Sequence, residues 1–253
     1  RKRVGLAVFA SDALSSTAYA TQESMIILAA AGTAALAFVF PISVVIVLLL
    51  AIVTVSYVQV IHTYPSGGGG YIVSRDNLGD VAAMVAGAAL LIGYILTVAV
   101  SIASAVAQIV SAFPQWFQYR ALISVVLILI MMVINLRGVR ESGAIFAIQS
   151  YYYLLLTGLM VVAGVIRYLT CQLSGVHDPP EMYETTLQPL GLFLILRAFS
   201  SGTTAMTGVE AISNGVTAFK EPRGHNASIT LIWMSAILGV LFIGISFLAV
   251  QVG

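Results

Sequence analysis

Charged residues are scarce in this sequence. Of its 253 residues, 11 are Lys or Arg and 10 are Asp or Glu, so that only 8% carry a charge. A soluble domain typically carries about 25% charged residues, and the charges here are too few to cover a surface exposed to water. Residues of the apolar set make up 60% of the chain. The composition therefore excludes an ordinary soluble domain and predicts that most of the surface faces lipid.

Other scarcities exclude further classes of protein. The net charge is only +1, so we expect no nucleic-acid partner. The single cysteine, Cys171, excludes an internal disulfide and a cysteine-based metal cluster. The glycine run Gly67–Gly70 lacks the following Lys of a phosphate-binding loop, so no nucleotide or other cofactor is expected. No nucleophile, base and orienting group stand together, and we therefore do not expect an enzyme.

Long apolar runs fill the rest of the chain. A bilayer core is crossed by about 20 apolar residues in a helix, and most of these runs reach that length. The sequence therefore predicts an all-α membrane protein with seven spans. They cover about 4–31, 36–61, 81–113, 121–136, 144–166, 187–216 and 227–252.

Basic residues between the spans predict the orientation. One side of the membrane would carry Arg1, Lys2, Arg3, Arg75, Arg137, Arg140, Lys220 and Arg223, and the other side only Arg120 and Arg167. Loops rich in Lys and Arg stay in the cytoplasm. We therefore expect a multi-pass protein of the bacterial plasma (inner) membrane with a cytoplasmic N-terminus. The acidic loop with Asp178, Glu181 and Glu184 would lie outside.

Four ionisable residues fall inside the predicted spans: Asp12, Glu23, Arg197 and Glu210. Such a residue costs about 2.5–3.5 kcal/mol at the membrane centre and usually faces a water-filled cavity or a partner. Polar runs accompany two of them, Ser11–Thr17 beside Asp12 and Ser200–Thr204 before Glu210. Irregular backbone is tolerated at this depth only where it lines a cavity. We therefore predict that the first and sixth spans are broken helices, which mark the substrate site in inverted-repeat transporters.

The third span adds three hydroxyl groups. Tyr94, Thr97 and Ser101 are spaced to lie on one face of a helix. Hydroxyls, carboxylates and free carbonyl groups form a set of hard oxygen ligands that suits a dehydrated monovalent cation. A structural explanation stays open, since Ser and Thr in membrane helices often bond their own turn or a neighbouring helix. Arg197 would then pair with an acid, and Tyr151–Tyr153 would lie at the membrane interface.

Several motifs resemble the amino acid–polyamine–cation transporter superfamily and its KUP-like branch of potassium importers. They are Ser11–Tyr19, Tyr64–Ser74, Tyr94–Ser101, Asn135–Gly138, Ala198–Gly202 and Thr207–Asn214. The resemblance covers essentially the whole chain. It implies a LeuT-like fold of two inverted five-helix repeats, potassium import coupled to protons by alternating access, and a homodimer. Seven spans do not complete two such repeats, so we expect residues 1–253 to form a single transporter domain that lacks the last three core helices and any cytosolic C-terminal domain.

The resemblance also implies a site. Carried over position by position, the residues that bind potassium would be Asp12, Tyr19, Tyr94, Thr97, Ser101, Thr207 and Glu210. Asp12 and Glu210 are candidates for proton coupling, because a carboxylate in a dry cavity holds a proton and releases it when a cation arrives. Arg197 stands where the resemblance leads us to expect Lys, and Gln22-Glu23 inverts the expected order.

Three other functions stay open. An amino-acid permease of the same superfamily usually has a Gly-rich break in its first span, whereas Ser11–Thr17 contains Asp12 and no Gly. A seven-helix receptor usually has the opposite orientation, and the last predicted span carries no Lys for retinal. A membrane enzyme would need a catalytic set that the sequence does not offer.

Overall fold

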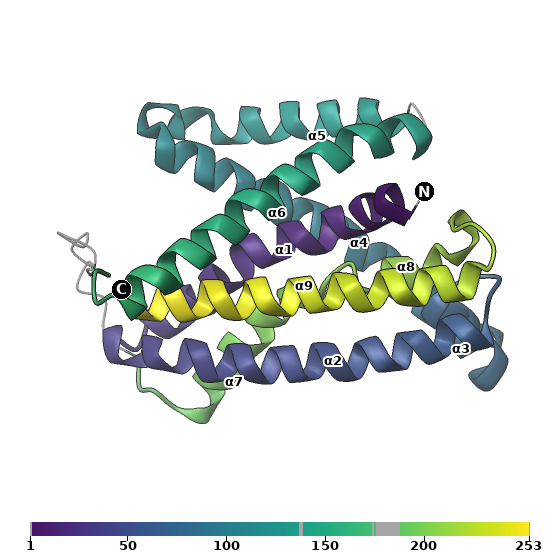
Figure 1. Cartoon of the computed structure of the whole chain (residues 1–253), viewed down its shortest axis with the longest axis horizontal. Helices are drawn as coiled ribbons and strands as arrows, with labels where there is room; N and C mark the ends of the chain where they lie inside the picture. Colours follow the sequence, from purple (N-terminus) through teal and green to yellow (C-terminus); the bar gives the residue numbers. More distant parts are fainter. Residues whose placement is uncertain (1, 137–138, 174, 176–187, 253) are drawn as a thin grey trace.

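The computed structural model describes residues 2–136, 139–173, 175 and 188–252, except for the side chains of residues 2–12 and 139–146. Within this part of the chain the secondary structure is entirely helical (Figure 1). The elements are α1 (Lys2–Ala29), η1 (Thr33–Phe38), α2 (Val39–Thr63), α3 (Gly69–Leu78), α4 (Asp80–Ala112), η2 (Pro114–Tyr119), α5 (Arg120–Leu136), α6 (Val139–Leu169), α7 (Leu192–Gly202), η3 (Thr203–Met206), α8 (Glu210–Asn214), η4 (Val216–Ala218) and α9 (Arg223–Val252).

Among the residues whose side chains are described, five helical segments are long and apolar enough to cross a membrane. They are Thr33–Thr63, Asp80–Ala112, Pro114–Leu136, Ala147–Leu169 and Arg223–Val252. A shorter apolar segment, Leu192–Met206, belongs to the predicted sixth span. The expectation of an all-α protein with several membrane helices is therefore confirmed. The predicted acidic loop with Asp178, Glu181 and Glu184 lies outside the described residues.

The core lies along α1, α2 and α9. Helices α2 and α9 lie side by side along most of their length, and α1 packs against α6, α7 and α9 (Figure 1). Two clusters of buried apolar side chains occupy this seam, one around Leu231 and Leu238 and the other around Ile46 and Phe242. By contrast, few side chains of α4 and α5 are buried. Their apolar surface suits contact with lipid.

The first predicted span is not broken. Helix α1 runs without interruption from Lys2 to Ala29, which corrects the prediction of a break near Ser11–Thr17. The segment Ser11–Thr17 contains no glycine, and the Thr17 hydroxyl donates a hydrogen bond to the Leu14 carbonyl oxygen within the same turn, at 2.7 Å. A hydroxyl bonded in this way is compatible with a continuous helix, so polar composition alone does not interrupt the backbone.

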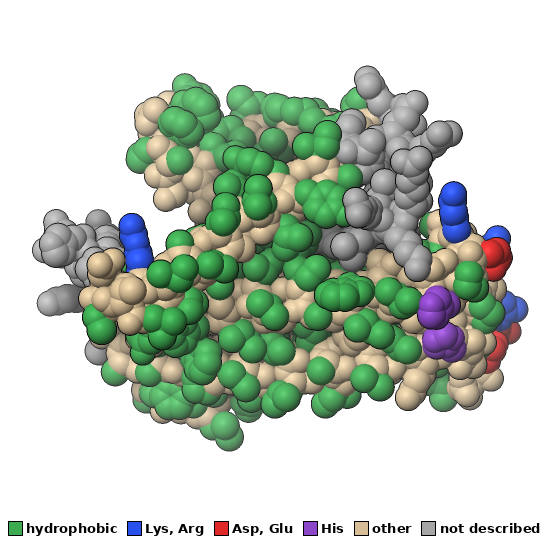
Figure 2. Space-filling view, in the orientation of Figure 1, with side chains coloured by type: hydrophobic (Ala, Val, Ile, Leu, Met, Phe, Trp, Pro, Cys, Tyr) green, Lys and Arg blue, Asp and Glu red, His purple; other side chains and the backbone are tan. Residues whose placement is uncertain are grey.

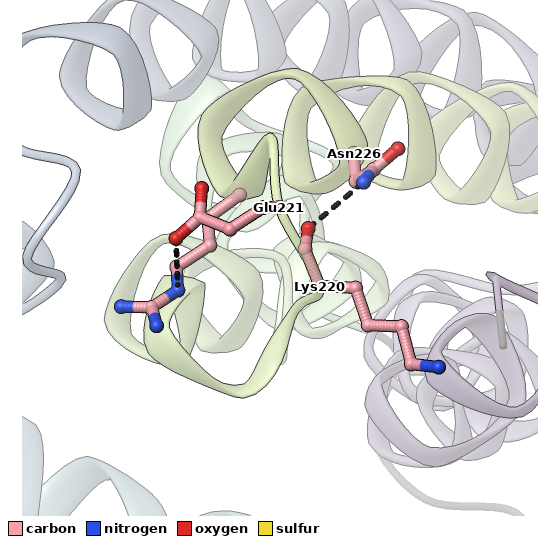
Figure 3. Close-up of polar contacts among 4 residues, drawn as sticks. Lys220, Glu221 and Asn226 are labelled. Atoms are coloured by element: carbon pink, nitrogen blue, oxygen red, sulfur yellow. Dashed lines mark hydrogen bonds and ion pairs between the residues drawn. The ribbon is translucent and has the colours of Figure 1, made fainter.

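Charged side chains gather at one end of the molecule, where α3, α8 and the start of α9 lie (Figures 1 and 2). Arg75 pairs with Asp80 at 3.3 Å, and Arg223 pairs with Glu221 at 3.0 Å. Beside the second pair, the Asn226 side chain donates to the Lys220 carbonyl oxygen at 2.9 Å and holds the turn that leads into α9 (Figure 3). Apolar side chains cover the long sides of the helices, as expected for a lipid-facing surface (Figure 2).

Candidate functional site

The predicted sixth span is interrupted, as its polar sequence predicts. Helix α7 ends at Gly202, one turn of 3-10 helix follows, and α8 begins only at Glu210. Three hydroxyls in this stretch donate to backbone carbonyl oxygens three residues earlier, at 2.6–2.9 Å: those of Thr203, Thr204 and Thr207. Thr17 forms the same type of bond within the continuous helix α1, so these bonds alone do not explain the interruption. Gly208 adopts φ 83°, a conformation that favours glycine and turns the chain into α8.

Helix α1 places a buried polar surface against this break. The Ser16 hydroxyl forms a hydrogen bond with the Thr207 hydroxyl, which joins α1 to the residue after η3. Ser16 also lies 3.4 Å from the hydroxyl oxygen of Tyr19, one turn further along α1. Because Ser16 and Tyr19 are both buried, these hydroxyls meet inside the protein.

Helix α4 completes the arrangement. The Tyr19 hydroxyl lies 3.3 Å from the Ser101 hydroxyl, so α1 is joined to α4 as well as to the break. We call Ser16, Tyr19, Ser101 and Thr207 the hydroxyl cluster. Three of its members, Tyr19, Ser101 and Thr207, are residues that the resemblance implies. The structure therefore brings together oxygen atoms from three separate segments of the chain.

Tyr94 makes a different contact. Its hydroxyl oxygen accepts a hydrogen bond from the side-chain amide of Asn214, at 2.7 Å. Glu210, four residues before Asn214, lies at the start of α8 and is half-buried. A second set of predicted site residues therefore lies around α8.

The remaining candidates are placed less closely. Thr97 is half-buried on the face of α4 between Tyr94 and Ser101. The side chain of Asp12 lies outside the described residues, although its backbone belongs to α1. Glu23 is half-buried near the far end of α1, and Arg197 on α7 is exposed. The structure thus adds neither Glu23 nor Arg197 to the hydroxyl cluster.

Three residues that contribute here are absent from the predicted site. Ser16 links two predicted site residues, and Asn214 holds a third. Tyr153 was interpreted as an interfacial residue, but it is half-buried and its hydroxyl lies 3.3 Å from that of Thr17. Ser16 and Asn214 do fall within the motifs that carry the resemblance. Spacing alone does not tell which hydroxyl in a helix contacts another helix.

The chemistry of the described site is that of hard oxygen ligands. Hydroxyl groups from three segments meet beside a carbonyl-rich helix end, and Glu210 lies on the continuation of the same chain. Within the described residues, no three His, Cys, Asp or Glu side chains are grouped as transition-metal ligands would be. Oxygen ligands of this kind suit an alkali cation that has lost water.

Comparison with known proteins adds two findings. The family model described as amino acid permease matches residues 6–252. Over its full length, the chain is 44% identical to the potassium transporter KimA of Bacillus subtilis strain 168, and the match covers 41% of that protein. The chain therefore spans about two fifths of the length of this curated relative.

Proposed function

Because this chain belongs to the amino acid permease family, we propose that it forms part of a secondary transporter that imports potassium, coupled to protons, by alternating access. The chain would cross the bacterial plasma membrane several times, with its N-terminus in the cytoplasm. Its helices would belong to a LeuT-like fold of two inverted repeats, and the full-length protein would form a homodimer.

The hydroxyl cluster is the observation that carries this proposal. It places oxygen atoms of Tyr19, Ser101 and Thr207 at the break that follows α7. Tyr19 is buried there, and Ser101 and Thr207 are half-buried. A potassium ion that enters without its water needs several such oxygens around it. The relative that matches the whole chain is named a potassium transporter, which agrees with this choice of ion.

The proposed cation ligands are the hydroxyls of Tyr19, Tyr94, Thr97, Ser101 and Thr207, with the carboxylates of Asp12 and Glu210. A neutral set of hydroxyls orients an ion, whereas a carboxylate balances its charge. Either acid would carry the coupled proton, because a carboxylate in a dry cavity holds a proton and releases it when a cation arrives. In this exchange, the binding of each cation would depend on whether one of the two acids carries a proton.

An amino-acid permease is the second candidate, and the description of the matching family favours it. Such a protein would hold the substrate carboxylate with free backbone N–H groups at a break in its first helix. Helix α1 is continuous from Lys2 to Ala29, so its backbone N–H groups between Ser11 and Thr17 lie within regular helix. This feature supports a cation rather than an amino acid as the substrate.

The test is rubidium uptake and growth at low potassium, in bacteria that lack their own potassium importers, with the full-length protein expressed. We expect Asp12→Asn and Glu210→Gln each to abolish uptake, because each change removes a negative charge from the site. Asp76→Asn, on the exposed helix α3, is the control and should transport like the wild type. Full uptake by either site variant would contradict the proposed roles. Absence of uptake by a well-inserted wild type would favour the amino-acid permease.

A further inference from the structure

Asn214, the last residue of α8, contacts two other segments of the chain. Its side-chain amide donates to the Tyr94 hydroxyl of α4 at 2.7 Å. Its backbone carbonyl oxygen accepts a hydrogen bond from the Gly68 N–H at 3.4 Å, which connects α8 to the turn before α3. The distal half of the broken span is therefore attached both to α4 and to the glycine run.

The glycine run permits this close approach. Gly67, Gly68 and Gly69 all have positive φ, at 81°, 100° and 45°, in a region that favours glycine. A Cβ atom on Gly69 would lie 2.1 Å from the Asn214 side-chain oxygen, and a Cβ on Gly67 would lie 2.8 Å from the Asn214 carbonyl oxygen. Side chains at Gly67 and Gly69 would push Asn214 away. Gly70 differs, because a Cβ atom there meets nothing within 4 Å.

The position of Tyr94 shows at which end of the hydroxyl cluster this contact lies. Tyr94 precedes Ser101 of the hydroxyl cluster by seven residues, which is about 10 Å along a helix, toward the start of α4. That start adjoins α3, at the end of the molecule where the charged side chains gather (Figures 1 and 2). Tyr94 and Asn214 therefore lie between the hydroxyl cluster and that end of the molecule.

We propose that the hydrogen bond between Asn214 and Tyr94 closes the cation site at the end where α3 lies, and that it breaks when the site opens there. This inference rests on the proposed function, since a transporter must open its site to each side in turn. Asn214 is then a positioning residue. It holds the Tyr94 hydroxyl against α8, and the glycine run keeps Asn214 in place.

Thiol labelling tests the contact without reference to the transported solute. A Thr97→Cys reporter, placed between Tyr94 and Ser101, is introduced into the full-length protein free of other reactive cysteines. Inside-out membrane vesicles expose the α3 end to a membrane-impermeant maleimide. Asn214→Ala should raise the labelling rate on the order of threefold to tenfold, the change that one net hydrogen bond supports. Tyr94→Phe should raise the rate by a similar factor.

The double variant separates a shared contact from two unrelated effects on folding. If the two residues act through one hydrogen bond, the double variant labels no faster than either single variant. Gly69→Ala should reproduce the faster labelling because it displaces the Asn214 side chain, whereas the matched Gly70→Ala should not. Unchanged labelling in Asn214→Ala, or multiplicative rates in the double variant, would overturn the proposal.

Rubidium uptake is measured in parallel on the same variants without the Thr97→Cys reporter, because Thr97 is itself a proposed cation ligand. A wild type that takes up no rubidium, but whose labelling still depends on Asn214 and Tyr94, would reject potassium transport and retain the closing contact. A wild type that takes up rubidium, with labelling that does not depend on Asn214, would support potassium transport and reject the closing contact. The two proposals are therefore distinguished by one set of variants.

Discussion

Single hydroxyl groups make the described contacts at the break, and Ser16 contributes two of them. Its oxygen meets both Tyr19 and Thr207, so it holds two proposed ligands in place from within α1. Replacing Ser16 with Ala would leave both neighbours with one partner fewer. Each such loss typically costs about 0.5–1.5 kcal/mol.

We therefore expect Ser16→Ala to raise the KM for rubidium uptake by about threefold to tenfold, since the neighbouring oxygens lose their orientation. Ser43→Ala is a matched control, because Ser43 is also buried in a helix but donates only to the Val39 carbonyl oxygen of its own turn, at 2.8 Å. Initial uptake rates over a range of rubidium concentrations provide the comparison. Equal KM values for the two variants would show that Ser16 does not orient the site.

Residue types and motifs predicted part of this arrangement. The resemblance pointed to Tyr19, Ser101 and Thr207, and the structure brings these three side chains together. It did not point to Ser16, because a serine within a polar helical run bonds its own turn as readily as another helix. Which of these occurs depends on how closely the helices pack, and that is a tertiary property.

At the scale of the element, two similar polar runs fold differently. The run before Glu210 is broken as predicted, and the run beside Asp12 is not. Glycine distinguishes them, since Gly202 and Gly208 flank the break and Ser11–Thr17 contains none. Hydroxyl side chains are compatible with a continuous helix and with a broken one, whereas the left-handed conformation at Gly208 excludes a regular helix there.

Gly208→Ala is expected to weaken the break. An alanine at φ 83° would cost about 1–2 kcal/mol, so the variant should unfold at a lower temperature and lose uptake. Gly158→Ala in α6 is the control, because a Cβ atom there meets nothing within 4 Å and its backbone is helical. Thermal unfolding of the purified full-length proteins in detergent measures the difference. A Gly208→Ala protein as stable and active as Gly158→Ala would contradict the need for this turn.

At the scale of the whole molecule, composition was the most reliable guide. Scarce charge and long apolar runs predicted a helical membrane protein, which agrees with the long apolar helices of the described residues and with membership of the amino acid permease family. Packing was harder to foresee, because apolar residues face lipid as readily as they face another helix. Helices α4 and α5, whose side chains are mostly exposed, and α9, which has many buried side chains, are all strongly apolar.

Cys171 offers a direct test of the predicted orientation. It is exposed just beyond the end of α6, and the positive-inside rule places it outside the cell. A membrane-impermeant maleimide should therefore label Cys171 in spheroplasts, whereas Lys220→Cys in a Cys171→Ser protein should react only after permeabilisation. Mass spectrometry of the labelled peptides provides the measurement. The reverse pattern would place the N-terminus outside.

The interruption after α7 has an electrostatic consequence that does not depend on any acid. The helical segment formed by α7 and η3, Leu192–Met206, ends beside Thr207, and the carbonyl groups at its end carry about half an elementary negative charge. Unlike a carboxylate, this partial charge cannot be neutralised by a proton. This partial charge would therefore still attract a cation at the hydroxyl cluster at acid pH, even when the carboxylates of Asp12 and Glu210 carry protons.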